Sequence, residues 1–422
     1  MREMKNSGVR WLGMIPKAWD LDKIVSLYSE RSTKVSDRDY PALSVTKQGI
    51  VPQLESAAKT DNGDNRKLIK KNDFVINSRS DRRGSCGISE YEGSCSLINI
   101  VLAPKNNMVN QYYNYLFKTE LFADEFYKWG NGIVDDLWST KWSSMKNIMV
   151  PFPPLEEQRI IADYLDTKCT QIDTIIAKEQ AVIEKLQEYK KALITEAVTK
   201  GLNPNVNMKE SSLDWIGKVP ETYSLIKLKF LGEYFNGLTY SPDNLTDVDE
   251  GVLVLRSSNI KNGKLVLDDN VYVNIDTPRY LVKKNDILIC SRNGSRNLVG
   301  KNILLSEDIH AYFGAFMMIF RLNSEVYSKW VYYVLNSNLF LAYLGSFFSS
   351  TINQLTGKDF GNIIIPICDV EEAKQITECL DEKCSNIDSI ILKKQFTIDK
   401  LIEYKKSLIY EVVTGKKEVP YV

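Results

Sequence analysis

The sequence predicts an α+β fold in which two pseudo-symmetric, mixed α/β domains are separated by two long antiparallel helices that form a coiled coil. Three observations support this class. At 422 residues the chain is too long for one ordinary core. Its second half repeats its first, and each half ends in a long apolar pattern at coiled-coil spacing. The expected domains are residues 1–150 and 205–365, and the expected helices lie within 151–204 and 366–422.

An internal repeat covers the whole chain. The offset between matched positions grows only from 204 to 218 along most of its length. A solenoid needs several short repeats, so two long copies indicate a pseudo-dimer with an approximate twofold axis. The matched segments are 11–16 with 215–220, 70–73 with 283–286, 121–122 with 339–340, 165–173 with 380–388, and 188–191 with 403–406.

Within the mixed domains, short apolar runs bounded by polar residues predict strands at 74–76 and 287–289. The aromatic-rich stretches 111–127 and 329–344 predict helices.

The long helices have strong start and stop signals. Prolines 153 and 154 precede acidic residues at the start of the first helix. Asp369 stands three residues before Glu372 in a capping-box pattern at the start of the second. Gly201 and Gly415 are expected to end the two helices as C-caps.

Between these ends, the apolar spacing of 4-3-4-3 predicts a seam of about six heptads, and forty-odd residues at about 1.5 Å each give a rod of roughly 60 Å. A twofold axis perpendicular to the helices makes the pair antiparallel. The seam is expected at Leu165, Cys169, Ile172, Ile176, Glu179, Ile183, Leu186, Lys190, Leu193 and Ala197, and at Leu380, Cys384, Ile387, Ile391, Lys394, Ile398, Leu401, Lys405, Leu408 and Val412.

Glu179 and Lys394 interrupt the seam at corresponding positions near its middle. We expect the two side chains to face each other across the axis and to set the register, because a lone charge in a seam is costly. The alternative is that both are solvated residues at a gap in the seam.

Composition excludes several classes of protein. A formal net charge of zero argues against a non-specific nucleic-acid coat. The seven cysteines are irregularly spaced and form no C-x-x-C pair, so we expect reduced thiols and no metal site. No apolar run is long enough to span a bilayer and no signal peptide is visible, which favours a cytoplasmic protein without a membrane partner.

The order of these parts resembles the specificity subunit of type I restriction–modification systems. The resemblance covers essentially the whole chain and is carried by the W-[LI]-G-x-[IV]-P motif that opens each half, by the phrase 150–158 before the first helix, and by the alternation of unlike modules with similar helices. One departure is that residues 365–373, at the start of the second helix, lack the Pro-Pro and the glutamine of the first copy.

The resemblance implies that each mixed domain is a target-recognition domain that binds one half of a bipartite, asymmetric site in double-stranded DNA. It implies that the helices set the spacing between half-sites and dock two modification subunits. S-adenosylmethionine would belong to those subunits, and ATP and Mg²⁺ to the motor and restriction subunits of the complex, so no cofactor is expected in this chain. A twofold axis is consistent with reading surfaces about one DNA turn, roughly 34 Å, apart.

The strongest candidates for DNA contact follow the matched strands, in polar turns with repeated arginines. Arginine binds phosphate or guanine, and asparagine binds adenine. We expect the arginines present in both copies to position the DNA backbone or the local structure, and the differing residues to read sequence. The alternative is a polar turn with solvated cations or local ion pairs. The candidates are Arg79, Arg82 and Arg83 in the first copy and Arg292, Asn293 and Arg296 in the second.

Two further pairs of segments are weaker candidates, because packing or an ordinary turn explains them as well. Segments 135–142 and 351–358 precede the long helices and contribute Lys141, Asn353, Gln354 and Lys358, although Trp138 and Trp142 in the first suggest packing. Two polar turns contribute Lys47 and Gln48, and Asn259 and Lys261.

No catalytic pattern is found, which predicts a chain that is not itself an enzyme. The chain has one histidine, His310, and lacks a phosphate-binding loop and the G-x-S-x-G and H-E-x-x-H motifs. Two other classes stay open: a methyltransferase or nuclease polypeptide with fused recognition modules, and a coiled-coil scaffold that binds only proteins. S-adenosylmethionine binding by the isolated chain would favour the first, and an absence of sequence-selective DNA binding would favour the second.

Overall fold

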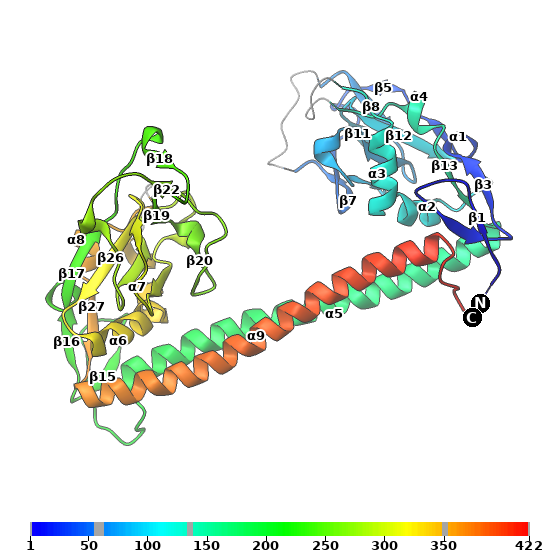
Figure 1. Ribbon diagram of the computed structural model, residues 1–422. Helices are drawn as coiled ribbons and strands as arrows, with labels where there is room; N and C mark the ends of the chain where they lie inside the picture. Colours follow the sequence, from blue (N-terminus) through cyan, green and yellow to red (C-terminus); the bar gives the residue numbers. More distant parts are fainter. Residues whose placement is uncertain (1, 55–62, 133–137, 348–352, 421–422) are drawn as a thin grey trace. The chain divides into compact units, whose positions relative to one another are not determined.

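The computed structural model describes residues 2–54, 63–132, 138–347 and 353–420. The chain forms two compact units. Unit 1 consists of Met1–Gln180 and Phe396–Val422, and unit 2 consists of Ala181–Gln395. Each unit holds one mixed domain and parts of two long helices, α5 (Leu155–Lys200) and α9 (Val370–Val413) (Figure 1).

The central sheet has the same topology in both units. Every neighbouring pair in these two sheets is antiparallel. The strands predicted at 74–76 and 287–289 are confirmed and lie at equivalent interior positions, as β9 and β23. Unit 1 has the order β10 (Cys86–Ile88), β9 (Phe74–Asn77), β12 (Asn99–Pro104), β4 (Tyr28–Glu30), and unit 2 has β24 (Asn302–Leu304), β23 (Ile287–Cys290), β26 (Met317–Leu322), β17 (Gly232–Asn236).

Smaller sheets surround each central sheet. Two of them recur, because β1–β2 corresponds to β14–β15 and β3–β13 to β16–β27. Their bounds are β1 (Met4–Asn6), β2 (Met14–Pro16), β14 (Met208–Glu210), β15 (Lys218–Pro220), β3 (Asp20–Lys23), β13 (Met149–Phe152), β16 (Ser224–Lys227) and β27 (Ile364–Ile367).

The remaining strands differ between the units. Unit 1 has the order β11 (Gly93–Cys95), β8 (Arg66–Ile69), β5 (Lys34–Val35) and the hairpin β6 (Leu43–Thr46), β7 (Gly49–Pro52). Unit 2 has the order β18 (Leu245–Thr246), β22 (Tyr272–Val273), β19 (Val252–Leu255), β25 (Ala311–Phe313) and the hairpin β20 (Ile260–Lys261), β21 (Lys264–Leu265).

The aromatic-rich stretches are helical, as predicted, and each is divided into two helices. Residues 111–127 are divided between α2 (Asn110–Phe117) and α3 (Glu120–Lys128), and residues 329–344 between α6 (Glu325–Leu335) and α7 (Asn338–Phe347). The cause is a buried hydroxyl at each break. Thr119 and Ser337 donate to the carbonyl three residues earlier, at 2.7 and 2.6 Å, and accept from an amide of the next helix.

The W-[LI]-G-x-[IV]-P motif is part of the hydrophobic core. Leu12 and Ile15 are fully buried, and the Trp11 ring packs edge-on against Phe122 at 5.8 Å between centroids. Gly13 and Gly217 both have positive φ, 67° and 72°, which favours glycine at the turn. The motif therefore stabilises each mixed domain.

The ends of the long helices agree with the sequence signals. Asp369 Oδ1 accepts from the amides of Glu371 and Glu372 at 3.0 Å, which confirms the N-cap. The reciprocal half of the predicted capping box is not formed, because the Glu372 carboxylate accepts a 3.0 Å hydrogen bond from the Tyr223 hydroxyl in place of the Asp369 amide. Gly201 is the first residue beyond α5 and Gly415 the second beyond α9, and their φ values of 72° and 71° are typical of glycines at helix C-termini.

The two long helices are antiparallel within each unit (Figure 1). In unit 1 the start of α5 packs against the end of α9, with Leu165 and Ile172 in one core with Leu408 and Val412. In unit 2 the end of α5 packs against the start of α9, where Ile194 and Ala197 share a core with Leu380 and Cys384. All predicted seam positions are buried or half-buried, as a coiled-coil seam requires. Among the described residues, no helix is apolar over enough of its length to cross a membrane.

Candidate nucleic-acid interface

In unit 1, the structure joins the first two candidate segments. The turn after β9 forms a 3₁₀ helix, η1 (Ser80–Arg82), and lies beside residues 138–140. Arg79 forms an antiparallel bridge with Ser139. The Ser80 amide donates to the Trp138 carbonyl at 3.1 Å, and the Thr140 amide donates to the Ser78 carbonyl at 3.0 Å. We call the two segments, residues 78–83 and 138–141, loop pair 1.

Unit 2 repeats this arrangement after the equivalent strand, β23. Arg292 forms an antiparallel bridge with Gln354. The Leu355 amide donates to the Ser291 carbonyl at 2.8 Å, and Asn353 Nδ2 donates to the Gly294 carbonyl at 3.2 Å. We call residues 291–297 and 353–358 loop pair 2. Two segments that are distant in sequence thus meet at the same place in both units.

The bridges also correct the alignment of the second segment. Ser139 corresponds to Gln354, which is an offset of 215 rather than the 216 implied by matching 135–142 with 351–358. Lys141, the residue before α4 (Trp142–Met145), therefore corresponds to Thr356, the residue before α8 (Gly357–Gly361). Both Lys141 and Lys358 are exposed, but they do not occupy equivalent positions. Residues 135–137 and 351–352 of these segments lie outside the described residues.

The arginines of loop pair 1 contact carboxylates. Asp81 lies 3.2 Å from Arg79 Nε and 3.5 Å from Arg82 Nε. Arg83 forms an ion pair with Asp124 of α3, and its guanidinium lies 5.8 Å from the centre of the Tyr127 ring. Arg82 and Arg83 are exposed and Arg79 is half-buried. Local ion pairs, the alternative interpretation of this turn, are therefore present.

The cations of loop pair 2 have different surroundings. Arg292 and Arg296 are exposed, and the Arg292 guanidinium lies 5.4 Å from the centre of the Phe316 ring. Asn293 is half-buried and donates from Nδ2 to the Ser257 hydroxyl at 3.3 Å. Its Oδ1 accepts from the Ser295 amide at 2.9 Å. Asn293 thus links the turn to the segment before β20.

That neighbouring segment contacts a further cation that sequence inspection did not identify. Lys301 Nζ donates to the Ser257 carbonyl at 2.9 Å, and burial lowers the pKa of its ammonium. No local sequence motif around Lys301 indicates this contact, because only folding brings β24 beside residue 257.

The third candidate pair, the polar turns that hold Lys47 and Gln48 and that hold Asn259 and Lys261, has different local structures in the two units. Lys47 and Gln48 are exposed at the turn between β6 and β7, and Lys261 is exposed on β20 with its Nζ 3.2 Å from Asp268.

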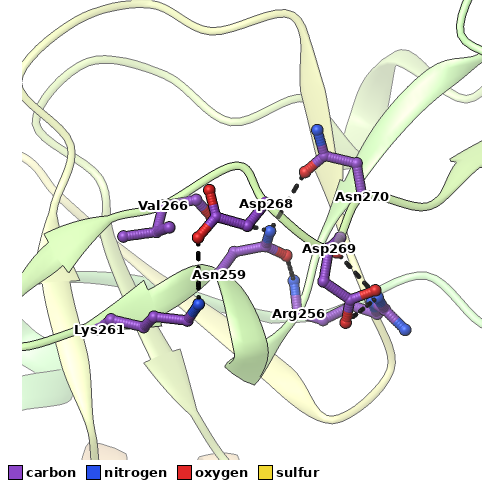
Figure 2. Close-up of polar contacts among 7 residues, drawn as sticks. All are labelled: Arg256, Asn259, Lys261, Val266, Asp268, Asp269 and Asn270. Carbon is purple, nitrogen blue, oxygen red and sulfur yellow. Dashed lines mark hydrogen bonds and ion pairs between the residues drawn. The ribbon is translucent and has the colours of Figure 1, made fainter. Parts of the chain in front are cut away.

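Asn259 is fully buried. Figure 2 shows that its amide lies between Arg256 and Asn270. Its Oδ1 accepts from the Arg256 amide at 2.8 Å, and its Nδ2 donates to the Val266 carbonyl at 3.0 Å.

The geometry of Asn259 therefore does not support the prediction that it contacts DNA. Its polar atoms bond within the hairpin and are closed to solvent. Arg256 and Asp269, which sequence inspection also did not identify, form a 2.9 Å ion pair at the base of the same hairpin.

Within the described ranges, no three His, Cys, Asp or Glu side chains gather where they could hold a metal ion. His310 is exposed in the loop before β25, as its polar sequence surroundings indicate. The geometry is that of two polar surfaces rich in arginine and amide groups, which can donate hydrogen bonds to phosphates and to base edges.

The profile of a family described as "Type I restriction modification DNA specificity domain" matches residues 29–185 and 220–405. The chain is 25% identical over 365 residues to the specificity subunit of the type I restriction enzyme MjaVIII from Methanocaldococcus jannaschii, covering 83% of this chain and 80% of that one. It is 22% identical over 363 residues to the StySPI specificity subunit from Salmonella potsdam, covering 82% and 75%.

A solved structure has a similar fold. It comes from a study of complex assembly and conformational transition of the type I R-M system. The two chains superpose with a TM-score of 0.70 at 13% identity, covering 96% of this chain and 99% of the other.

Proposed function

This chain belongs to the family of type I restriction modification DNA specificity domains, and from that premise we propose that it reads a bipartite, asymmetric site in double-stranded DNA. Each unit would bind one half-site. The observation that carries this proposal is the recurrence of one loop-pair geometry, with an arginine bridging to the second segment in both units. The same bridge holds an arginine in both turns, so the two units present a cation at one equivalent place.

The differences between the loop pairs account for an asymmetric site. Arg79 and Arg292 occupy equivalent positions, and we assign them to positioning the loop and the DNA backbone. The neighbouring residues differ, since 80–83 reads Ser-Asp-Arg-Arg and 293–296 reads Asn-Gly-Ser-Arg. Unlike side chains on like scaffolds would read unlike base pairs.

The remaining candidates are assigned to backbone contact or support. Lys47, Lys141 and Lys358 are exposed cations that fit phosphate contacts, and Gln48 and Lys261 lie exposed on the two hairpins. Asn353 and Gln354 are half-buried. Asn353 bonds to the Gly294 carbonyl, so its role would be to shape the turn.

The helices would set the half-site spacing and dock two modification subunits. An exposed isoleucine and an exposed tyrosine recur at equivalent positions on α5 and α9. Ile175 and Tyr404 belong to unit 1, where they are 45% and 51% exposed, and Ile390 and Tyr189 belong to unit 2, where they are 44% and 59% exposed. Equivalent apolar surfaces fit two copies of one partner.

The chemistry of the complex would lie in those partners. In this proposal the chain is a cytoplasmic recognition subunit without catalysis of its own. The modification subunits supply S-adenosylmethionine-dependent methylation, and the motor and restriction subunits supply ATP- and Mg²⁺-dependent cleavage. The structural features that support a recognition role are the paired loops and the duplicated helix surface.

A DNA selection tests the recognition role directly. The full chain, together with its modification subunit, is incubated with random-sequence duplexes, and bound DNA is sequenced. We expect two short enriched motifs separated by a fixed unspecified spacer. Arg82→Ala should relax one motif and Arg296→Ala the other, with a loss of about 1–3 kcal/mol of discrimination where a base contact is removed.

The matched control is Lys17→Ala, which removes an exposed cation that is paired with Glu3 and belongs to neither loop pair. It should leave both motifs intact. Enrichment of no sequence would favour the protein-only scaffold, and binding of S-adenosylmethionine by the chain alone would favour the fused methyltransferase.

A further inference from the structure

We propose that Asp81 is a specificity-determining residue that weakens binding of loop pair 1 to non-cognate DNA by competing with phosphates for arginines. This inference rests on the proposed function, because it assumes that loop pair 1 faces DNA. It concerns discrimination between specific and non-specific DNA.

The geometry places one carboxylate between two candidate DNA contacts. Asp81 is the second residue of η1, and its two oxygens lie 3.2 Å from Arg79 Nε and 3.5 Å from Arg82 Nε. Its side chain is 40% exposed and that of Arg82 is 68% exposed, so DNA can reach both groups. The third arginine of the loop, Arg83, is paired with Asp124.

The backbone holds this arrangement in place. The Arg82 amide donates to the Arg79 carbonyl at 3.2 Å, and the Arg79 amide donates to Asn77 Oδ1 at 3.0 Å. The bridge to Ser139 fixes the other side of Arg79. Asp81 therefore has a defined position between the arginines.

Loop pair 2 lacks this carboxylate. Gly294 stands two residues after Arg292, as Asp81 stands two residues after Arg79, and residues 291–297 contain no Asp or Glu. The turns after β9 and β23 thus present arginines at one topological place, but only the first turn has an acidic residue within its own sequence.

A carboxylate in this position acts differently on phosphate and on bases. A phosphate that binds Arg82 or Arg79 must displace Asp81 and approach a charge of its own sign. A G·C pair can satisfy both groups, since arginine donates to guanine O6 and N7 while aspartate accepts from cytosine N4. Asp81 should therefore disfavour contacts to the backbone alone and tolerate a matching base pair.

The test compares Asp81→Asn with the wild-type full chain. The probes are labelled random-sequence duplexes and the duplex that the wild-type chain enriches from the random pool, titrated over a series of salt concentrations. Asp81→Asn should bind random duplexes about fivefold more tightly, the effect of losing one exposed ion-pair competitor. The slope of its log affinity against log salt concentration should steepen by the amount expected for about one additional phosphate contact. Its preference for the enriched duplex should fall.

Gly294→Asp is the reciprocal variant in unit 2. A Cβ added at Gly294 meets nothing within 4 Å, so the substitution has room. It should weaken binding to random duplexes and flatten the salt dependence. Gly294→Ala separates the effect of the side chain from the effect of the charge, and both the fall in random-duplex affinity and the flattening of the salt dependence should be larger for Gly294→Asp than for Gly294→Ala.

The outcomes separate this inference from the proposed function. If the wild-type chain enriches no sequence, the proposed function fails and the inference fails with it. If the wild-type chain enriches a sequence but Asp81→Asn leaves the random-duplex affinity, the salt slope and the preference unchanged, the role of Asp81 alone is overturned.

Discussion

At the level of single residues, each central sheet has a buried carboxylate at an equivalent position, but the arginine that pairs with it comes from a different place. Asp73 and Asp286 occupy equivalent positions, are 2% and 1% exposed, and each binds one guanidinium through two hydrogen bonds. The arginines come from different segments. Arg31 follows β4, whereas Arg321 lies on β26, next to β17.

An uncharged residue stands at each position from which the arginine is missing. Phe235 stands in unit 2 where Arg31 stands in unit 1, and the Arg321 guanidinium lies 5.5 Å from the centre of its ring. Ala103 stands in unit 1 where Arg321 stands in unit 2. A buried carboxylate needs a cation, and either neighbouring strand can supply it.

Burial also sets the reactivity of the cysteines. Burial raises the pKa of Cys86, Cys95 and Cys368 to about 12 and of Cys384 to about 11, because it penalises the thiolate. Burial also raises the pKa of Cys169 and Cys290. Cys379 is only half-buried.

We therefore expect iodoacetamide at about pH 8 to modify Cys379 first in the native protein, since the thiolate is the nucleophile. Mass spectrometry of the digested protein measures labelling at each cysteine. The same reaction in denaturant is the control and should label all seven cysteines. Fast native labelling of Cys86 or Cys95 would contradict the burial of these thiols.

At the level of elements, the long helices are held by ion pairs that repeat with the pseudo-symmetry. Lys405 contacts Asp173 in unit 1, and Lys190 contacts Asp388 in unit 2, each with both carboxylate oxygens at 2.7 Å. Each pair joins α5 to α9, and both lysines were predicted seam positions. The aspartates lie one residue beyond predicted seam isoleucines and were not predicted as partners.

A double-mutant cycle should detect this coupling. We expect Lys405→Met and Asp173→Asn each to lower the free energy of unfolding, with a coupling of about 0.2–1 kcal/mol because the pair is partly exposed. Chemical denaturation measures it. Lys190→Met with Asp388→Asn should give a similar value in unit 2, and a coupling of zero in both cycles would show that the pairs do not stabilise the helices.

The pairing of Glu179 with Lys394 stays a prediction from the sequence. If the two charges set the register, Lys394→Glu should lower the melting temperature and Glu179→Lys with Lys394→Glu should restore it. Thermal unfolding of the two single variants and the double variant measures this. Unchanged stability of Lys394→Glu would support the alternative of solvated residues at a gap in the seam.

At the level of the whole molecule, each unit is assembled from distant parts of the chain. Unit 1 combines its mixed domain with the start of α5 and the end of α9, and the Tyr112 hydroxyl donates to the Val413 carbonyl at 2.7 Å across 301 residues. Unit 2 combines its own domain with the end of α5 and the start of α9. Both helices continue from one unit into the other.

This continuity predicts that helix length sets the half-site spacing. Inserting one heptad into each helix, after Gln180 and after Gln395, keeps the seam in phase. At about 1.5 Å per residue the insertion adds about 10 Å, or about three base pairs at 3.4 Å. Sequencing of selected DNA should show both motifs unchanged and the spacer longer by about three base pairs.

A heptad inserted into α5 alone is the control, because it leaves the seams of the two helices unequal in length. That variant should select DNA poorly. If the variant with both insertions keeps the original spacer, the helices do not act as a ruler.

Local and periodic features could be predicted from the sequence. Residues near in sequence determine caps and strands, so Asp369, Gly201, Gly415 and the strands after residues 73 and 286 were predicted correctly. Heptad spacing identifies a helix seam because it depends only on the helical repeat. The internal repeat showed that the chain holds two copies of one unit.

Only the tertiary structure determined which distant segments meet. The bridges from Arg79 to Ser139 and from Arg292 to Gln354 join segments about 60 residues apart, and no local pattern encodes such a contact. Burial of Asn259 likewise depends on the hairpin that folds over it. Sequence determines conformation over a few residues, whereas loop contacts and side-chain exposure depend on which surfaces pack together when the whole chain folds.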